Sequence, residues 1–176
     1  MRFAYADPPY IGKAHLYADQ PTYAGEVDHR ALIVSLEDRR HAGELAGWAL
    51  SCSTESLPFL LSLIPRARIC TWVKPLPVQD TTTGILTRTE HVLVVGGRPT
   101  RPGIPNFLMA APARGGGSDL IGRKPVAFSA WLFRLLGMVP GDTLEDLFPG
   151  TGQVGRSWAT LAQCSATRRA CQDDAT

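Results

Sequence analysis

Residues 143 to 155 have the sequence TLEDLFPGTGQVG, in which an expected strand runs into a glycine-rich turn and then into a helix. The glycines form the pattern G-x-G-x-x-G, which indicates a ligand site when it stands between a strand and a helix. They let the backbone approach a ligand closely, and the following helix offers unpaired N–H groups. Asp146, at the end of the strand, is expected to hold a cationic group such as an ammonium. The segment therefore predicts an α/β domain with a ligand-binding turn.

The rest of the chain alternates short apolar runs with helical patterns. Such alternation predicts a mainly parallel sheet, in which ligands bind beyond the carboxyl ends of the strands. Asp28 is expected to cap the first helix, and Ser53 or Thr54 the second. Gly137 is expected to end the third helix, and residues 97 to 122, rich in Gly, Pro and Arg, predict a long loop. The expected strands are 2–6, 45–52, 67–73, 90–95 and 143–148, and the expected helices are 29–36, 57–64, 126–136 and 154–161.

Length and composition limit the kinds of protein that the chain encodes. With 176 residues, 44% hydrophobic and 19% charged, it fits one globular domain, assigned to residues 1–162 and followed by a polar tail at 163–176. No apolar run is long enough to predict a membrane span, and the four cysteines lack zinc-ligand spacing. We therefore expect a reduced, cytoplasmic protein with no metal and no membrane contact.

A second unusual turn, Asp7-Pro8-Pro9-Tyr10, follows the first expected strand. By itself an Asp-Pro-Pro segment is equally well explained as a structural turn. Its residues also suit methylation of a conjugated amine, which is a poor nucleophile because its lone pair is delocalised into a ring. The Asp7 carboxylate and the Pro8 carbonyl can accept the two amine hydrogens and localise that lone pair. Tyr10 offers an aromatic face to a base extruded from the helix, a stacking contact that contributes about 1–3 kcal/mol.

Together the two turns resemble the motifs of the amino-methyltransferases that act on DNA bases. The catalytic motif of that family is (D/N/S)-P-P-(Y/F/W), and its cofactor motif F-x-G-x-G is similar to Phe148-Pro149-Gly150-Thr151-Gly152. The catalytic motif stands first here, which resembles the permuted order of the β-type enzymes, and Lys124-Pro125 is similar to a further motif that precedes the cofactor strand. The likeness extends over residues 1 to 162 and is strongest to short methyltransferases of actinobacterial phages and prophages.

The resemblance implies a Rossmann-like methyltransferase fold, circularly permuted and shortened at its C-terminus, with S-adenosylmethionine as cofactor. It implies methyl transfer to adenine N6 of double-stranded DNA, since Asp at the first motif position is typical of adenine enzymes. In the family a further strand carries the acid that binds the ribose, and the expected C-terminal shortening leaves that residue unassigned. The implied cofactor-binding residues are Asp146, Phe148, Pro149, Gly150, Thr151, Gly152, Lys124 and Phe128, and the implied catalytic residues are Asp7, Pro8, Pro9 and Tyr10.

Contact with DNA has to come from a local group of cations, because the net charge of the chain is only +2. Basic residues gather between positions 98 and 124. No separate recognition domain is apparent, so sequence specificity is expected to be weak or to come from a homodimer or a partner. The residues predicted to contact DNA phosphates are Lys13, Arg98, Arg101, Arg114 and Arg123.

Three alternative functions are compatible with the same motifs. The two acceptors of the catalytic turn suit cytosine N4 in DNA or adenosine N6 in RNA as well as adenine N6 in DNA. The expected C-terminal shortening is also compatible with a nucleic-acid-binding subunit that has lost activity. A nicotinamide-dependent oxidoreductase is disfavoured, because the Asp-Pro-Pro-Tyr turn has no role in that chemistry.

Overall fold

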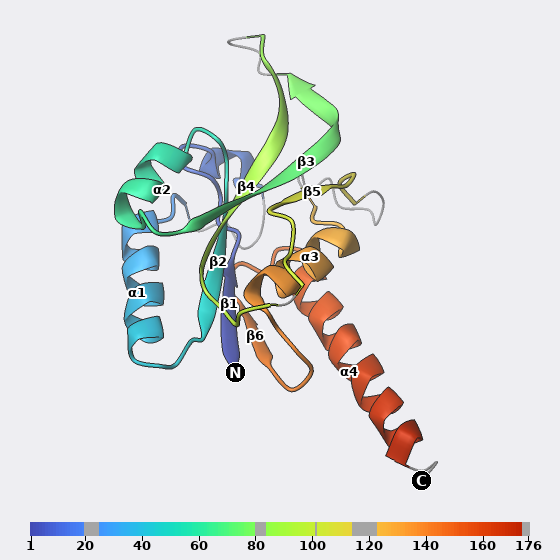
Figure 1. Cartoon of the computed structure of the whole chain (residues 1–176). Helices are drawn as coiled ribbons and strands as arrows, with labels where there is room; N and C mark the ends of the chain where they lie inside the picture. The colour runs from blue at the N-terminus through green and yellow to red at the C-terminus, as the bar shows by residue number, and fades with distance from the viewer. Residues whose placement is uncertain (20–24, 80–83, 101, 114–122, 174–176) are drawn as a thin grey trace.

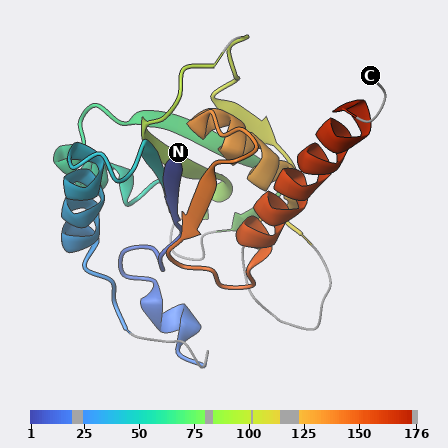
Figure 2. The same ribbon diagram turned by 90° about the horizontal axis from the view of Figure 1, so that it is seen from below.

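The computed structural model describes residues 1–19, 25–79, 84–100, 102–113 and 123–173. Within these residues six strands form one sheet of order β5-β3-β4-β2-β1-β6, with helices on both of its faces (Figures 1 and 2). The strands are β1 (Arg2–Ala6), β2 (Gly47–Cys52), β3 (Arg68–Gln79), β4 (Leu86–Gly96), β5 (Phe107–Met109) and β6 (Thr143–Asp146). The helices are the 3₁₀ helix η1 (Ala14–Tyr17), α1 (His29–His41), α2 (Leu57–Leu63), α3 (Val126–Leu136) and α4 (Gln153–Asp173).

The strand directions confirm the α/β fold with a mainly parallel sheet. β1 pairs in parallel with β2 on one side and with β6 on the other, and β3 pairs in parallel with β5. β4 is antiparallel to both of its neighbours, β2 and β3, so it runs against the other strands. The carboxyl ends of β1, β2, β3 and β6 therefore lie at one edge of the sheet, together with the amino-terminal half of β4.

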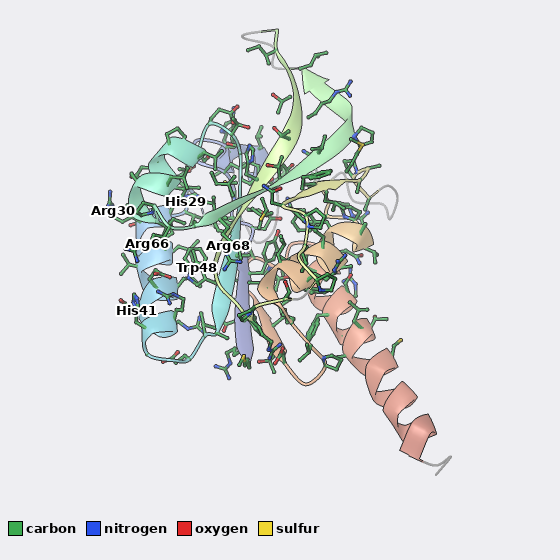
Figure 3. All side chains as sticks on the ribbon, in the orientation of Figure 1. His29, Arg30, His41, Trp48, Arg66 and Arg68 are labelled. Atoms are coloured by element: carbon green, nitrogen blue, oxygen red, sulfur yellow. The ribbon has the colours of Figure 1, made fainter. Side chains whose placement is uncertain are left out.

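The central strand β1 divides its side chains between two cores. Phe3 and Tyr5 belong to the cluster that includes α3, whereas Ala4 and Ala6 belong to the cluster that includes α1 and α2. This alternation follows from the two-residue period of a strand, and burial of all four is typical of a central strand in a parallel sheet. Trp48 of β2, labelled in Figure 3, belongs to the core on the α1 face. Its indole N–H donates to a Glu37 carboxylate oxygen at 2.8 Å.

The helix signals in the sequence are largely confirmed. Asp28 caps α1 by accepting a hydrogen bond from the Ala31 N–H at 3.0 Å. α3 occupies the predicted residues, and Gly137 ends it in the left-handed conformation. α2 differs from the expectation, because its N-cap is Ser56, while Ser53 forms the turn that precedes the helix.

The prediction that Lys74-Pro75 ends the third strand is wrong. β3 continues to Gln79 and forms a two-stranded ribbon with the first part of β4, which rises above the rest of the sheet in Figure 1. The pairing register shifts between Val73 and Val78, and β5 lies along β3 only as far as Val73. The prolines of this stretch lie beyond β5 and within the interruption of the pairing with β4, and such irregular edge positions tolerate a residue without an N–H.

Other predicted boundaries also differ: α1 continues to His41, β4 begins at Leu86 and β6 ends at Asp146. The segment 97–122, expected to be loop throughout, contributes the short strand β5. The last helix, expected to end at 161, continues to Asp173 and projects away from the sheet in both views (Figures 1 and 2). No Gly or Pro interrupts residues 156 to 173, so nothing in this stretch breaks the helix. No helix in the described part of the chain has the length and apolarity needed to cross a membrane.

At the amino end of the parallel strands, Asp142 joins three segments of the chain. Its carboxylate accepts hydrogen bonds from the Met1 ammonium at 2.7 Å, from two Arg98 guanidinium nitrogens at 2.9 and 3.1 Å, and from the Val139 N–H at 2.8 Å. The Asp142 side chain is only 4% exposed. The hydrogen bonds from Arg98 lower its pKa well below the ordinary value, although burial opposes this shift.

We expect Asp142→Asn to lower the free energy of unfolding by about 2–3 kcal/mol at pH 7, because it leaves the Arg98 charge without its buried partner. Since the pKa of Asp142 is lowered in the folded state, the stabilisation exists above the ordinary pKa and is lost as the pH falls. Urea unfolding at pH 7 and pH 3 tests this. The exposed Asp38→Asn on α1 serves as the control, and equal stabilities of wild type and Asp142→Asn at pH 7 would contradict the assignment.

Candidate active site

The Asp7-Pro8-Pro9-Tyr10 turn begins where β1 ends. In the strand register, Tyr5 lies opposite Asp146 of β6 and Ala6 lies opposite Leu50 of β2. The Asp7 and Asp146 carboxylates therefore lie at the ends of adjacent parallel strands. The Asp7 side chain is 25% exposed, so it remains accessible to a ligand from solvent.

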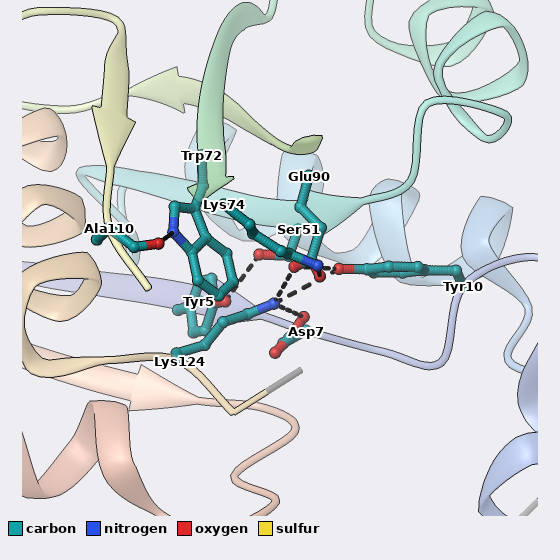
Figure 4. A network of polar contacts seen from close by, with 9 residues as sticks. All are labelled: Tyr5, Asp7, Tyr10, Ser51, Trp72, Lys74, Glu90, Ala110 and Lys124. Carbon is teal, nitrogen blue, oxygen red and sulfur yellow. Dashed lines mark hydrogen bonds and ion pairs between the residues drawn. The ribbon is translucent and has the colours of Figure 1, made fainter. Parts of the chain in front are cut away.

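A chain of alternating charges runs from Asp7 to Lys74 (Figure 4). The Lys124 Nζ atom lies 3.3 Å from Asp7 Oδ1 and 2.6 Å from Glu90 Oε2. The other carboxylate oxygen of Glu90 accepts a hydrogen bond from Lys74. The Tyr10 hydroxyl donates to Glu90 Oε2 at 2.8 Å. Glu90 thus links both lysines to the tyrosine of the turn.

The ammonium groups of Lys124 and Lys74 make cation–π contacts with buried aromatic rings. The Lys124 Nζ atom lies 5.3 Å from the Trp72 ring centre and 5.4 Å from that of Phe128. The Lys74 Nζ atom lies 5.2 Å from the Trp72 ring. Trp72 is fully buried and donates its indole N–H to the Ala110 carbonyl at 2.8 Å. Desolvated cation–π contacts contribute up to about 2 kcal/mol each, so these rings help to fix both ammonium groups.

Burial and charge oppose one another in this cluster. Burial raises the pKa of Asp7, and the nearby Lys124 charge offsets part of that rise. Burial also disfavours the charged form of Glu90, but Lys124 and Lys74 outweigh it and lower the pKa of Glu90 to about 2. Desolvation lowers the pKa of Lys124, whereas the two carboxylates raise it above the ordinary value. Glu90 and Lys124 are consequently ionised at neutral pH.

The glycine-rich turn lies next to this cluster, between β6 and α4. Gly150 and Gly152 have φ angles of 49° and 69°, a conformation that residues with a Cβ rarely adopt. The Gly152 N–H bonds to the Pro149 carbonyl, and α4 begins at the next residue. Asp146 Oδ1 is buried and has no hydrogen-bond partner within the described residues. Burial, followed by the negative charge of Asp7, raises the pKa of Asp146 to about 6.

The structure brings most of the predicted catalytic and cofactor residues to one edge. Asp7, Tyr10 and Lys124 belong to the charged cluster, and Asp146 leads into the turn that contains Phe148 and Thr151, both partly buried. Pro8 is buried, whereas Pro9 is partly exposed. Phe128, predicted to line the cofactor pocket, is fully buried and packs against Tyr5, Trp72 and Trp131 beneath Lys124.

The predicted DNA-contacting cations do not form one group. Lys13 is exposed shortly after the Asp7-Pro8-Pro9-Tyr10 turn, and its N–H donates to the Tyr10 carbonyl at 2.8 Å. Arg98 lies at the opposite end of the sheet, where it is held by Asp142 and by the Gly137 carbonyl. Arg123 precedes Lys124 and is partly buried. Arg101 and Arg114 lie outside the described residues.

Glu90 and Lys74 were not identified as site residues from the sequence. A signal for them exists, because Lys74-Pro75 and Lys124-Pro125 are two copies of the same dipeptide and both lysines contact Glu90. Glu90 was assigned only as the first residue of an apolar strand. A carboxylate at the start of a buried strand needs a cationic partner, and this requirement points to the two lysines.

A cavity of about 530 Å³ lies beside the Asp7-Pro8-Pro9-Tyr10 turn. Ile11, residues 26–30 at the start of α1, and Glu55, Ser56 and Phe59 around the start of α2 line it. Its volume is in the range of small-molecule sites. Among the residues that the structure describes, no three His, Cys, Asp or Glu side chains are grouped so that they could hold a metal ion.

Comparison with solved structures finds the same fold in two crystal structures of M1.HpyAVI. The crystal structure of the M1.HpyAVI-SAM complex aligns with a TM-score of 0.60 and 16% sequence identity, covering 91% of this chain and 78% of that chain. The crystal structure of M1.HpyAVI aligns with a TM-score of 0.54 and 18% identity, covering 91% and 76%. No protein-family model matches the sequence, and no curated protein sequence matches it. At this level of identity the likeness establishes the fold.

The raised pKa of Asp146 predicts a pH-dependent cost to stability. Because the pKa of Asp146 is raised to about 6 in the folded state, its charged form destabilises the folded protein. This destabilisation is absent below the ordinary pKa, grows as the pH rises, and is complete above pH 6. We therefore expect Asp146→Asn to increase the free energy of unfolding by about 1–2 kcal/mol at pH 8, after allowing for solvent screening, and to have little effect at pH 4. Urea unfolding at both pH values measures it, with Asp38→Asn as control, and a destabilised Asp146→Asn protein at pH 8 would contradict it.

Proposed function

We propose that this chain is an S-adenosylmethionine-dependent methyltransferase that acts on the N6 amine of adenine in DNA. The observation that carries the proposal is the position of Asp7, at the end of β1 and beside the Asp146 strand end that leads into the glycine-rich turn. The fold shared with the M1.HpyAVI-SAM complex supports it. So does the Asp at the first position of the catalytic motif, which is typical of the adenine enzymes that the sequence resembles.

The residues at the turn fit the chemistry of S-adenosylmethionine, which supplies an electrophilic methyl group on a sulfonium sulfur. The unpartnered buried oxygen of Asp146 is suited to the α-ammonium group of the cofactor. The left-handed glycines bring the chain directly into the N-terminus of α4, and a helix N-terminus favours polar or anionic groups of a ligand. We propose that Asp146 and the segment from Phe148 to Gly152 hold the cofactor.

The catalytic turn is suited to prepare the amine. Asp7 Oδ1 is the carboxylate oxygen next to Lys124, so the other oxygen is available to accept one amine hydrogen. We propose that the Pro8 carbonyl accepts the second hydrogen, because proline fixes its own φ angle and thus the direction of the chain there. These two contacts localise the nitrogen lone pair for attack on the methyl carbon. The new N–C bond forms as the S–C bond breaks, and the surplus amine proton leaves through Asp7 to water.

The charges around Asp7 favour a neutral amine over an ammonium group. Lys124 already provides a cation at 3.3 Å from the Asp7 carboxylate, so a second cation bound there would be repelled. An alkylamine is protonated at neutral pH, whereas the exocyclic amine of a base is not. Tyr10, held by Glu90 at its hydroxyl, offers its ring for stacking of an extruded base. These features support a nucleobase as the methyl acceptor.

We expect Asp7→Ala and Asp7→Asn to reduce methyl transfer by at least about 100-fold, because the preorganised charged acceptor is lost. Cofactor binding should persist, since Asp146 and the glycine-rich turn are unchanged. Methyl transfer from isotopically labelled S-adenosylmethionine, followed by nucleoside mass spectrometry, measures activity, and calorimetry measures binding. The exposed Asp38→Asn on α1 is the control.

The products of that assay also separate the alternatives. N6-methyladenine in DNA supports the proposal, and full activity of Asp7→Ala would falsify the assigned role of the turn. N4-methylcytosine, or methyl transfer only to RNA, would replace the substrate while retaining the site. The absence of both cofactor binding and product in the wild type would favour a nucleic-acid-binding subunit without activity.

A further inference from the structure

Glu90 contacts both lysines and the tyrosine of the charged cluster, although it does not belong to the Asp7-Pro8-Pro9-Tyr10 turn. It lies on β4 opposite Trp72 of β3 and is 8% exposed. Both carboxylate oxygens are used: Oε1 by Lys74, and Oε2 by Lys124 and by the Tyr10 hydroxyl. Because β4 runs antiparallel to its neighbours, its amino-terminal half brings this carboxylate to the edge where β1 ends.

Glu90 reaches Asp7 through Lys124. The Lys124 ammonium group is shared between two carboxylates, at 2.6 Å from Glu90 and at 3.3 Å from Asp7. The shorter distance shows that the stronger contact is with Glu90. If Glu90 lost its charge, the ammonium would be drawn towards Asp7. It would then compete with a substrate amine for the Asp7 oxygens.

Lys74 limits the opposite movement. It binds the Glu90 oxygen that Lys124 does not use, so the negative charge of Glu90 is divided between two cations. If Lys74 lost its charge, Glu90 would attract Lys124 more strongly. Asp7 would then lose part of the positive charge that favours its ionised form in this buried setting. The position of Lys124 therefore depends on both neighbours.

We infer that Glu90, with Lys74 as its counter-charge, is a positioning residue. It sets how closely the Lys124 ammonium group approaches the Asp7 carboxylate, and it holds the Tyr10 ring in place through the Tyr10 hydroxyl. This inference rests on the proposed function for its catalytic consequence. The effect of Glu90 on Asp7, Tyr10 and Lys124 can be tested without any methyl transfer. A role in stability only would leave the Asp7 carboxylate unaffected in both folded variants, whereas loss of the Glu90 charge and loss of the Lys74 charge should act on it with opposite signs.

The test measures the pKa of Asp7 by carbon-13 NMR of labelled aspartate, assigned with Asp7→Asn. Glu90→Gln should lower this pKa, because Lys124 moves towards Asp7 and a nearby negative charge is removed. Lys74→Met should raise it, because Lys124 moves towards Glu90. Glu44→Gln, an exposed glutamate at the other end of the sheet, should leave it unchanged. Shifts of the same sign, or no shift, in folded Glu90→Gln and Lys74→Met proteins would overturn the inference.

Kinetics supply the second readout. A displacement of the reacting groups by about 1 Å reduces the rate about 100-fold, so kcat of Glu90→Gln should fall by about that factor. The Kd for S-adenosylmethionine, measured by calorimetry, should change less than about threefold, because the glycine-rich turn is untouched. If the wild type is active and Glu90→Gln has the same kcat, the positioning role is overturned.

If the wild type transfers no methyl group, the proposed function fails, and the opposite NMR shifts still decide the inference. Should Glu90→Gln not fold, Glu90→Asp replaces it, since a shortened carboxylate that releases Lys124 should also lower the pKa of Asp7.

Discussion

Parallel pairing of β1 on both sides is the constraint on which the site depends. Because β2 and β6 run in the same direction as β1, the three strands end together, and the chain leaves each of them at the same edge. The Asp7-Pro8-Pro9-Tyr10 turn and the glycine-rich turn are distant in sequence, and this pairing makes them neighbours. The burial of β1 on both faces fixes the register, since a slip of one residue would exchange its two sets of side chains between the cores.

A cluster of two carboxylates and two ammonium groups lies at the same edge of the sheet, largely shielded from solvent. Asp7 and Glu90 are balanced by Lys74 and Lys124, and aromatic rings exclude water from beneath the lysines. Breaking such a cluster is costly, because each remaining charge stays desolvated. Asp146 differs from these groups, because one of its carboxylate oxygens is buried without a hydrogen-bond partner among the described residues. A buried polar atom of this kind lowers stability, and for that reason it is the feature on which the proposed cofactor contact rests.

Much of the fold and both turns could be predicted from the sequence, because glycine and proline impose backbone geometry locally. The strand ending at Asp7 and the helix ending at Gly137 agree with the structure for this reason. Glu90 could not be found in the same way. Its contacts depend on the reversed direction of β4 and on its register against β3, and neither leaves a trace in the adjacent residues. The prediction that the basic residues act together could not use their positions in the fold, since proximity in sequence does not tell which end of the sheet Arg98 occupies.

The burial of Trp72 has a spectroscopic consequence. Its indole is fully shielded from solvent, and two ammonium groups lie just over 5 Å from its ring. Indole emission responds to nearby charge, so the fluorescence of this side chain reports where the two lysines are. Substitution of the other three tryptophans by phenylalanine would isolate that signal. The protein thus carries a built-in optical probe next to the charged cluster, able to register changes there without any added label.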